Sequence, residues 1–171
     1  FCIIPTTRGP AESRPLARVL AEARRRLAEG HPELVLTGIN IGTYRDPGSG
    51  ARLADLVRVV GRLEGLARLR ISSIEPGDVD DALVAAIADT PAVAPHLHVP
   101  LQSGDPGVLR AMGRGYTVGE YLDACRRARA AIPGLNLTTD AIVGFPGEDE
   151  AAFRATARVA EDLAMGKVHV F

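Results

Sequence analysis

Apolar residues follow two alternating patterns along the chain. Segments in which they recur every three or four positions predict helices over residues 16–27, 53–63, 79–88, 108–112, 119–131 and 148–163. Between them, short and nearly continuous apolar runs predict strands over residues 34–37, 69–73, 96–101, 135–143 and 167–171. Residues 1–13 and 40–50 are expected to be loops. Asp78 is expected to cap the helix over 79–88, and Glu148 the helix over 148–163.

Strands that alternate with helices are typical of βαβ units and a parallel sheet. The fold class is therefore α/β, either an open doubly wound sheet or a barrel. In both, functional loops follow the carboxyl ends of the strands. Four of the predicted loops there are polar or glycine-rich, namely residues 37–40, 72–75, 102–104 and 144–148. Glycine-rich loops are common in α/β proteins, which explains any one of these motifs but explains four poorly. We therefore expect one shared site on one face.

The composition limits the class of protein without naming a partner. The chain has 171 residues, enough for one domain, and its formal net charge is -1, which gives no global sign of nucleic-acid binding. Positive charge is concentrated over residues 8–26, which contain six arginines and two glutamates. This segment is either a solvated helix face or a local surface for RNA phosphates.

Cysteine usage and the absence of targeting patterns favour a cytoplasmic protein. Two cysteines make no disulfide framework, and no signal segment or membrane-spanning run is visible, so no membrane partner is expected. The chain begins at Phe1 rather than Met and ends on an apolar run. It is therefore expected to be a fragment, truncated at both ends.

The segment around Cys2 reads FCIIPTTRG. A cysteine beside two isoleucines is by itself more typical of a buried apolar residue. In this context, however, the segment resembles the end of the C-x-x-x-C-x-x-C motif of radical S-adenosylmethionine enzymes, in the version found in methylthiotransferases. Four further motifs resemble that family in the same order: LTGINIGTY (36–44), RISSIEP (70–76), HLHVPLQSG (96–104) with VLRAMGRGYT (108–117), and TDAIVGFPGE (139–148).

The resemblance covers essentially the whole chain and implies a partial (β/α) TIM-like barrel that lacks its first strand. It also implies a [4Fe-4S] cluster, with Cys2 as its third ligand and two ligands upstream of Phe1. The open iron of such a cluster binds S-adenosylmethionine. An amino-terminal domain with a second [4Fe-4S] cluster and a carboxyl-terminal TRAM-like RNA-binding domain are expected in the intact protein, and residues 1–171 are its radical core. The fragment alone is expected to be inactive.

The same resemblance assigns site residues. The expected cofactor-binding residues are Thr37, Gly38, Glu75, Gln102, Ser103, Arg114, Ile142 and Gly144, and the expected catalytic residues are Asp140 and Glu75. Asp140 stands in an apolar strand, where an unpaired carboxylate is costly, which favours a site role.

Several of these residues also have a simpler explanation. Glu75 is equally typical of a helix cap, and Arg114 of an exposed loop. His96 and His98 share one face of a strand and form a hydrogen-bonded or site-lining pair more readily than a metal site. Cys125 lies in a predicted helix and is expected to be structural.

The second and third strand motifs indicate the substrate. They look most like the branch that acts on threonylcarbamoyladenosine in tRNA, so the expected activity is methylthiolation of that nucleoside beside the anticodon, with tRNA and a cellular electron donor as partners. The alternatives are isopentenyladenosine in tRNA or a ribosomal protein as substrate. An alternative of another class is a cluster-free α/β binding module.

Overall fold

The computed structural model describes residues 3–171, apart from the side chains of Pro5 and Arg8. Its helices are α1 (Ile4–Arg8), α2 (Leu16–Ala28), α3 (Leu53–Val60), α4 (Asp81–Ala88), α5 (Pro106–Ala111), α6 (Val118–Ala131) and α7 (Glu150–Asp162), with short 3-10 helices at Ile41–Thr43 and Pro76–Asp78. Its strands are β1 (Glu33–Leu36), β2 (Arg68–Ile71), β3 (His96–His98), β4 (Asn136–Ala141) and β5 (Lys167–Val170). All five predicted strands are present, whereas α1 falls in a segment predicted to be a loop.

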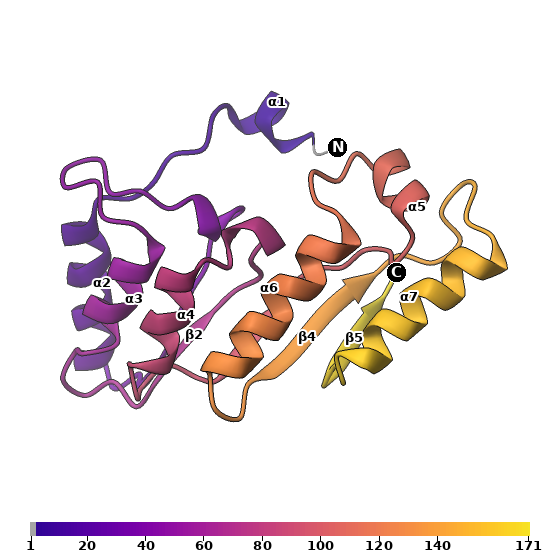
Figure 1. Cartoon of the computed structure of the whole chain (residues 1–171). Helices are drawn as coiled ribbons and strands as arrows, with labels where there is room; N and C mark the ends of the chain where they lie inside the picture. The colour runs from indigo at the N-terminus through magenta and orange to yellow at the C-terminus, as the bar shows by residue number, and fades with distance from the viewer. Residues whose placement is uncertain (1–2) are drawn as a thin grey trace.

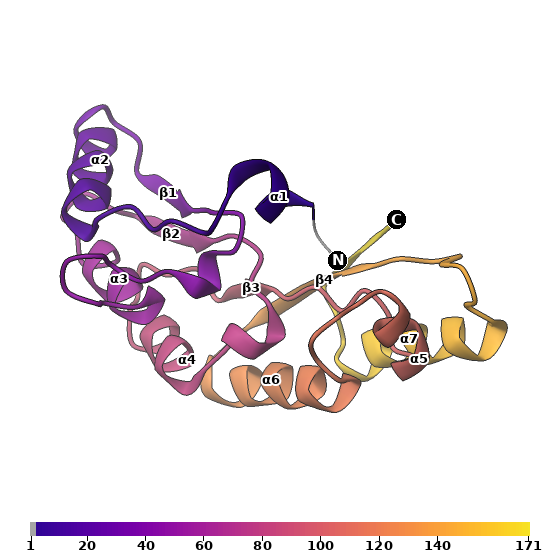
Figure 2. The ribbon, with the colours of Figure 1, turned by 90° about the horizontal axis from the view of Figure 1, so that it is seen from above.

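The strands lie side by side in chain order. β1 pairs with β2, and β3–β4–β5 form a second ladder, all in parallel. Backbone hydrogen bonds at Leu69 join the two ladders, because its N–H donates to Ala92 and its carbonyl accepts from Ala94. The helices from α2 to α7 follow the outer side of this curved array, while α1 lies on the open inner side (Figures 1 and 2). Sequential order with helices on one side is the arrangement of a (β/α) barrel and not of a doubly wound sheet.

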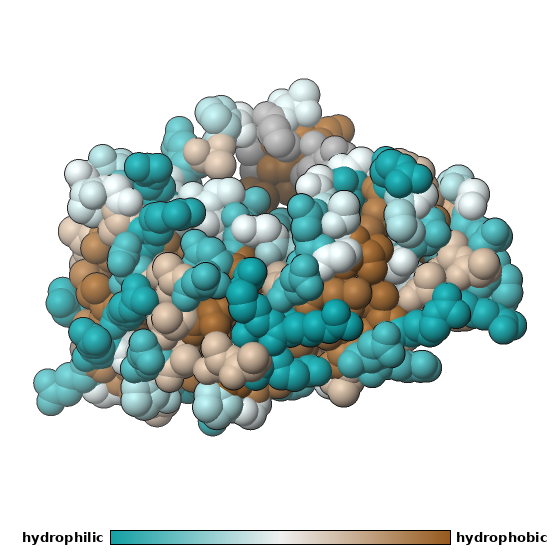
Figure 3. All heavy atoms as spheres, in the orientation of Figure 1, coloured by the Kyte–Doolittle hydropathy of each residue, from teal (hydrophilic) through white to brown (hydrophobic). Residues whose placement is uncertain are grey.

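Side-chain alternation divides the sheet into an apolar and a polar face. Leu69, Ile71, Leu97 and Leu137 point toward the helices and are buried in the main core. Their neighbours along each strand point to the inner side and are mostly charged or polar. The outer surface formed by the helices is largely hydrophilic, with smaller hydrophobic areas between them (Figure 3). No helix among residues 3–171 is long and apolar enough to cross a membrane.

Two helix caps differ from the prediction. Asp80, not Asp78, caps α4, since its carboxylate accepts from the Leu83 N–H at 2.8 Å. Asp78 instead ends the preceding 3-10 turn. Asp149, not Glu148, caps α7 by accepting from the Ala152 N–H at 2.8 Å.

The loop over residues 40–50 is tied to α2 by a buried carboxylate. Asp46 accepts from the Leu16 N–H at 2.7 Å, which satisfies a free donor of the first helical turn, and from the hydroxyl and N–H of Ser49. These hydrogen bonds, that of the Ser49 hydroxyl above all, lower the pKa of Asp46 to about 2. The link fixes the amino-terminal segment beside the end of β1.

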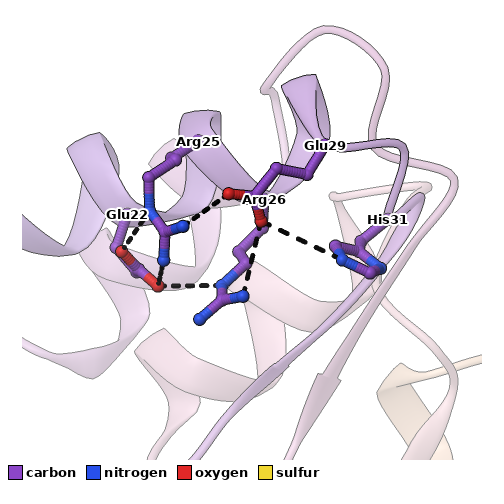
Figure 4. Close-up of polar contacts among 5 residues, drawn as sticks. All are labelled: Glu22, Arg25, Arg26, Glu29 and His31. Atoms are coloured by element: carbon purple, nitrogen blue, oxygen red, sulfur yellow. Dashed lines mark hydrogen bonds and ion pairs between the residues drawn. The ribbon is translucent and has the colours of Figure 1, made fainter.

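Two of the six arginines of the basic segment are paired with glutamates of their own helix. Arg25 and Arg26 both contact Glu22 and Glu29, and His31 lies 4.0 Å from Glu29 (Figure 4). These pairs are exposed and contribute little stability. They occupy two of the six arginines that the sequence offers to RNA phosphates.

Candidate functional site

A cleft of about 830 Å³ opens between the amino-terminal segment and the carboxyl ends of β1 and β2. This volume lies within the range of small-molecule and cofactor sites. The cleft is lined by the loop after β1, the loop after β2 and the segment before α2. The lining residues include Thr37, Gly38, Asn40, Tyr44, Ser73 and Glu75. Three of the predicted cofactor-binding residues, Thr37, Gly38 and Glu75, therefore line one cavity.

Glu75 is the acidic group of this cleft on the strand side. Its side chain is 37% exposed, and one carboxylate oxygen lies 4.0 Å from a guanidinium nitrogen of Arg114, which comes from the loop before α6. Burial raises the pKa of Glu75, the charge of Arg114 opposes that shift, and Asp78 reinforces it. Glu75 precedes a 3-10 turn but makes no side-chain cap there, so its carboxylate remains available to a ligand.

The cleft also contains polar atoms that suit a polar ligand. The Tyr44 hydroxyl is buried and has no hydrogen-bond partner within the described part of the chain. Burial, followed by the nearby charge of Asp46, raises the pKa of Tyr44, so this hydroxyl is a proton donor at neutral pH. Gly38 leaves the backbone open, because a Cβ there would be no closer than 3.7 Å to Ile41.

The loop after β3 packs against α7 instead of opening into the cleft. Ser103 is fully buried, and its hydroxyl accepts from the Asp105 N–H and lies 3.4 Å from the Thr156 hydroxyl. Gln102 is also buried, with φ at 65°, and its backbone pairs with residues 140 and 142 on either side of Ala141. Ser103 does not line the cleft, and its hydroxyl contributes to the packing of this loop.

The loop after β4 has mixed roles. Ile142 belongs to a small apolar cluster with Val108, Met112 and Ala152. Gly144 has φ at 71°, a conformation that favours glycine, and its N–H donates to the Glu148 carboxylate at 2.5 Å. Neither Ile142 nor Gly144 lines the 830 Å³ cleft.

Asp140 lies at the centre of a polar cluster on the inner face of the sheet. One of its carboxylate oxygens lies 3.2 Å from His98 Nε2 and 3.5 Å from His169 Nδ1. His98 Nδ1 and His96 Nε2 lie 2.9 and 3.0 Å from the Thr138 hydroxyl. The carboxylate is thus paired, as its place in the sheet requires. Sequence reasoning missed His169 and Thr138; the alternation of side chains along β4 and β5 is the signal that places them on this face.

Of the two cysteines in the chain, the structure describes only Cys125. Cys2 lies outside the described residues. Cys125 is buried in α6, and burial raises the pKa of its thiol to about 11, which suits a structural thiol and not a ligand. Within residues 3–171, no group of three or more His, Cys, Asp or Glu side chains is arranged to hold a metal ion.

Comparison with known protein families decides the class. The model of the Radical SAM superfamily matches residues 1–160. The chain belongs to this superfamily. Membership implies a [4Fe-4S] cluster and S-adenosylmethionine as cofactors. It also confirms the family resemblance carried by the sequence motifs and removes the cluster-free module as an alternative.

Curated relatives narrow the class further. A tRNA-2-methylthio-N(6)-dimethylallyladenosine synthase from Anaeromyxobacter dehalogenans (strain 2CP-C) is 47% identical over 161 residues, which are 94% of this chain and 34% of that protein. The threonylcarbamoyladenosine tRNA methylthiotransferase MtaB of Chlamydia pneumoniae is 43% identical and is matched by 100% of this chain over 40% of its own length. The chain thus spans about a third to two fifths of the relatives it matches, and those relatives belong to two substrate branches.

Solved structures support the same fold. The cobalamin-dependent S-adenosylmethionine radical enzyme OxsB superposes with a TM-score of 0.67 at 15% identity, covering 86% of this chain and 22% of that one. The archaeal Elp3 of Methanocaldococcus infernus gives a TM-score of 0.55 at 15% identity, covering 92% of this chain and 41% of that one. At this identity the likeness concerns the fold alone, and it agrees with the partial barrel seen here.

Proposed function

We propose that the intact protein transfers a methylthio group to a modified adenosine in tRNA. The observation that carries this proposal is the 42–47% identity, across nearly the whole chain, to relatives named as tRNA methylthio-transfer enzymes. A cytoplasmic location and a cellular electron donor are part of the same proposal.

The cleft at the ends of β1 and β2 is our candidate for the S-adenosylmethionine site. Glu75 would accept hydrogen bonds from the ammonium of the cofactor, and the open backbone at Gly38 would let that group approach closely. When bound, the cofactor and the cluster together supply a 5′-deoxyadenosyl radical that removes a hydrogen atom from the substrate. The chain's own contribution is to hold the cofactor and to exclude water.

Cys2 is proposed to ligate the cluster, together with cysteines upstream of Phe1. Its sequence context supports this role, and the second [4Fe-4S] cluster is proposed for a separate amino-terminal domain. The catalytic role of Asp140 likewise remains a proposal; its position on the inner face of the sheet, among histidines, is compatible with it.

The nucleoside is proposed to be threonylcarbamoyladenosine, on the motifs at residues 36–44 and 70–76. Dimethylallyladenosine, the isopentenyladenosine of the alternative above, is the second candidate, because several relatives at 42–47% identity are named for it. Mass spectrometry of tRNA nucleosides from a deletion strain, before and after complementation, separates the two. Loss and return of the methylthio mark on threonylcarbamoyladenosine supports our assignment. The same behaviour on dimethylallyladenosine assigns the other branch, and a change in neither nucleoside contradicts the proposed function.

A further inference from the structure

The inner face of the sheet is unusually polar for a barrel. In a closed (β/α) barrel this face is filled with bulky branched side chains. Here it carries Glu33 paired with Arg70 at 2.7 Å on β1 and β2, and the histidine, threonine and aspartate cluster on β3 to β5. These groups are only partly buried, with side-chain exposures of 15% for His98, 22% for Asp140 and 43% for His169. Such a surface is suited to contact a polar ligand.

The carboxylate of Asp140 sets the direction of every hydrogen in the cluster. It can only accept, so it favours a proton on the nitrogen that faces it, which is Nε2 in His98 and Nδ1 in His169. In this tautomer His98 has a lone pair on Nδ1, which accepts from the Thr138 hydroxyl, and that hydroxyl in turn accepts from His96 Nε2.

Nε2 of His169 is not used by any contact inside this cluster. With its proton on Nδ1, His169 presents the lone pair of Nε2 away from Asp140. An aspartate that orients an imidazole in this way strengthens the opposite nitrogen as an acceptor. The end of the cluster therefore offers a hydrogen-bond acceptor to whatever lies over the inner face.

Given the proposed function, on which this inference rests, we propose that His169, oriented by Asp140, positions the target adenine by accepting its exocyclic N–H. A base modified at N6 by a single group keeps one such N–H. The anionic carboxylate beside His169 disfavours a phosphate, so the uncharged base fits this position better than the RNA backbone. A carbonyl at the same place, as in guanine, would face a lone pair and be rejected.

This site is separate from the cofactor cleft. None of Asp140, His98 or His169 lines the 830 Å³ cavity, which is built on β1, β2 and the amino-terminal segment, whereas these residues lie on β3 to β5. The proposed base contact at His169 is therefore distinct from the cleft contacts of Thr37, Gly38 and Glu75. A change at His169 should consequently leave S-adenosylmethionine binding intact.

The test uses the intact, anaerobically reconstituted protein and a pair of anticodon stem–loop RNAs, one with the modified adenosine and one with guanosine in its place. Affinity for each RNA is measured for wild type, His169→Leu and His169→Gln. Lys167→Gln, on the same strand and two residues away, is the matched control. Affinity for S-adenosylmethionine and iron content are measured on every variant to establish that fold and cofactor site are unchanged.

The expected result is a preference for the adenosine RNA of about tenfold in wild type and in the control. His169→Leu should reduce that preference to within about twofold of unity, while His169→Gln, whose amide oxygen is an acceptor, should retain part of it. Full retention of the preference by His169→Leu overturns the inference while leaving the proposed function intact. If wild type modifies neither nucleoside in tRNA, the proposed function fails, and the inference fails with it.

Discussion

Replacing Gly104 with alanine should destabilise the domain, because the loop after β3 touches the backbone of α7 at this residue. A Cβ on Gly104 would stand 2.6 Å from the carbonyl oxygen of Ala155 and 2.7 Å from the Cα of Thr156. Ordinary contact begins at 3.4 Å, so the loop and the helix must separate by roughly 0.8 Å. Neither atom belongs to a side chain, and no change of rotamer relieves the clash.

The magnitude follows from two costs. Overpacking of a buried site costs about 1–3 kcal/mol. The Gly104 N–H also donates to the buried Thr156 hydroxyl at 2.8 Å, and weakening that bond adds about 1 kcal/mol. A total of about 2–4 kcal/mol corresponds to a fall in Tm of roughly 4–16 °C for a domain of this size.

Thermal unfolding of the intact protein, followed by calorimetry, measures the effect. Gly115→Ala is the matched control, because a Cβ there meets nothing within 4 Å, and its Tm should stay within about 2 °C of wild type. If Gly104→Ala unfolds at the same temperature as Gly115→Ala, the close packing of the loop after β3 against α7 is wrong.

Three further predictions concern the cofactors. Glu75→Gln should weaken S-adenosylmethionine binding by roughly 10- to 100-fold in calorimetric titration. Burial raises the pKa of Glu75 above its ordinary value of 4.5. As the pH is lowered, wild-type affinity for S-adenosylmethionine should therefore begin to fall at a higher pH than it would with an ordinary glutamate. The variant should lack this pH dependence, and equal pH profiles for the variant and wild type would count against the role of Glu75. Gly38→Val should weaken cofactor binding, because a side chain there would block close approach of the cofactor to the backbone; unchanged affinity argues against close approach there. Cys2→Ala in the intact protein should lower the iron content after anaerobic reconstitution, and unchanged iron with an unchanged cluster spectrum would exclude Cys2 as a ligand.

The strands and helices were predictable because each buries one face, which imposes a period on the sequence. The barrel arrangement was predicted by the family resemblance and not by the periodicity, since strand order depends on contacts between distant segments. Helix starts were harder still. The sequence predicts Asp78 as the cap of α4, but Asp78 ends the 3-10 turn at Pro76–Asp78 and Asp80 caps the helix.

In the candidate site, too, some positions follow from the order of the strands and others depend on contacts between distant residues. Thr37, Gly38 and Glu75 follow adjacent parallel strands, and adjacency alone brings them to one cleft. Ser103 also follows a strand, yet its hydroxyl turns to Thr156, more than fifty residues away, which no local pattern reveals. The sequence alone does not identify His169, because only the pairing register of β4 and β5 places it beside Asp140.

The central claim is that this chain is the radical core of a tRNA methylthiotransferase, and one measurement addresses it most directly. The intact protein, reconstituted anaerobically, is incubated with S-adenosylmethionine, a chemical reductant and tRNA from the deletion strain, and the nucleosides and small products are quantified by mass spectrometry. The account predicts that 5′-deoxyadenosine and a methylthio-adenosine derivative appear together and that both require reductant. A fully loaded cluster that yields 5′-deoxyadenosine but no methylthio nucleoside from either modified tRNA would contradict it.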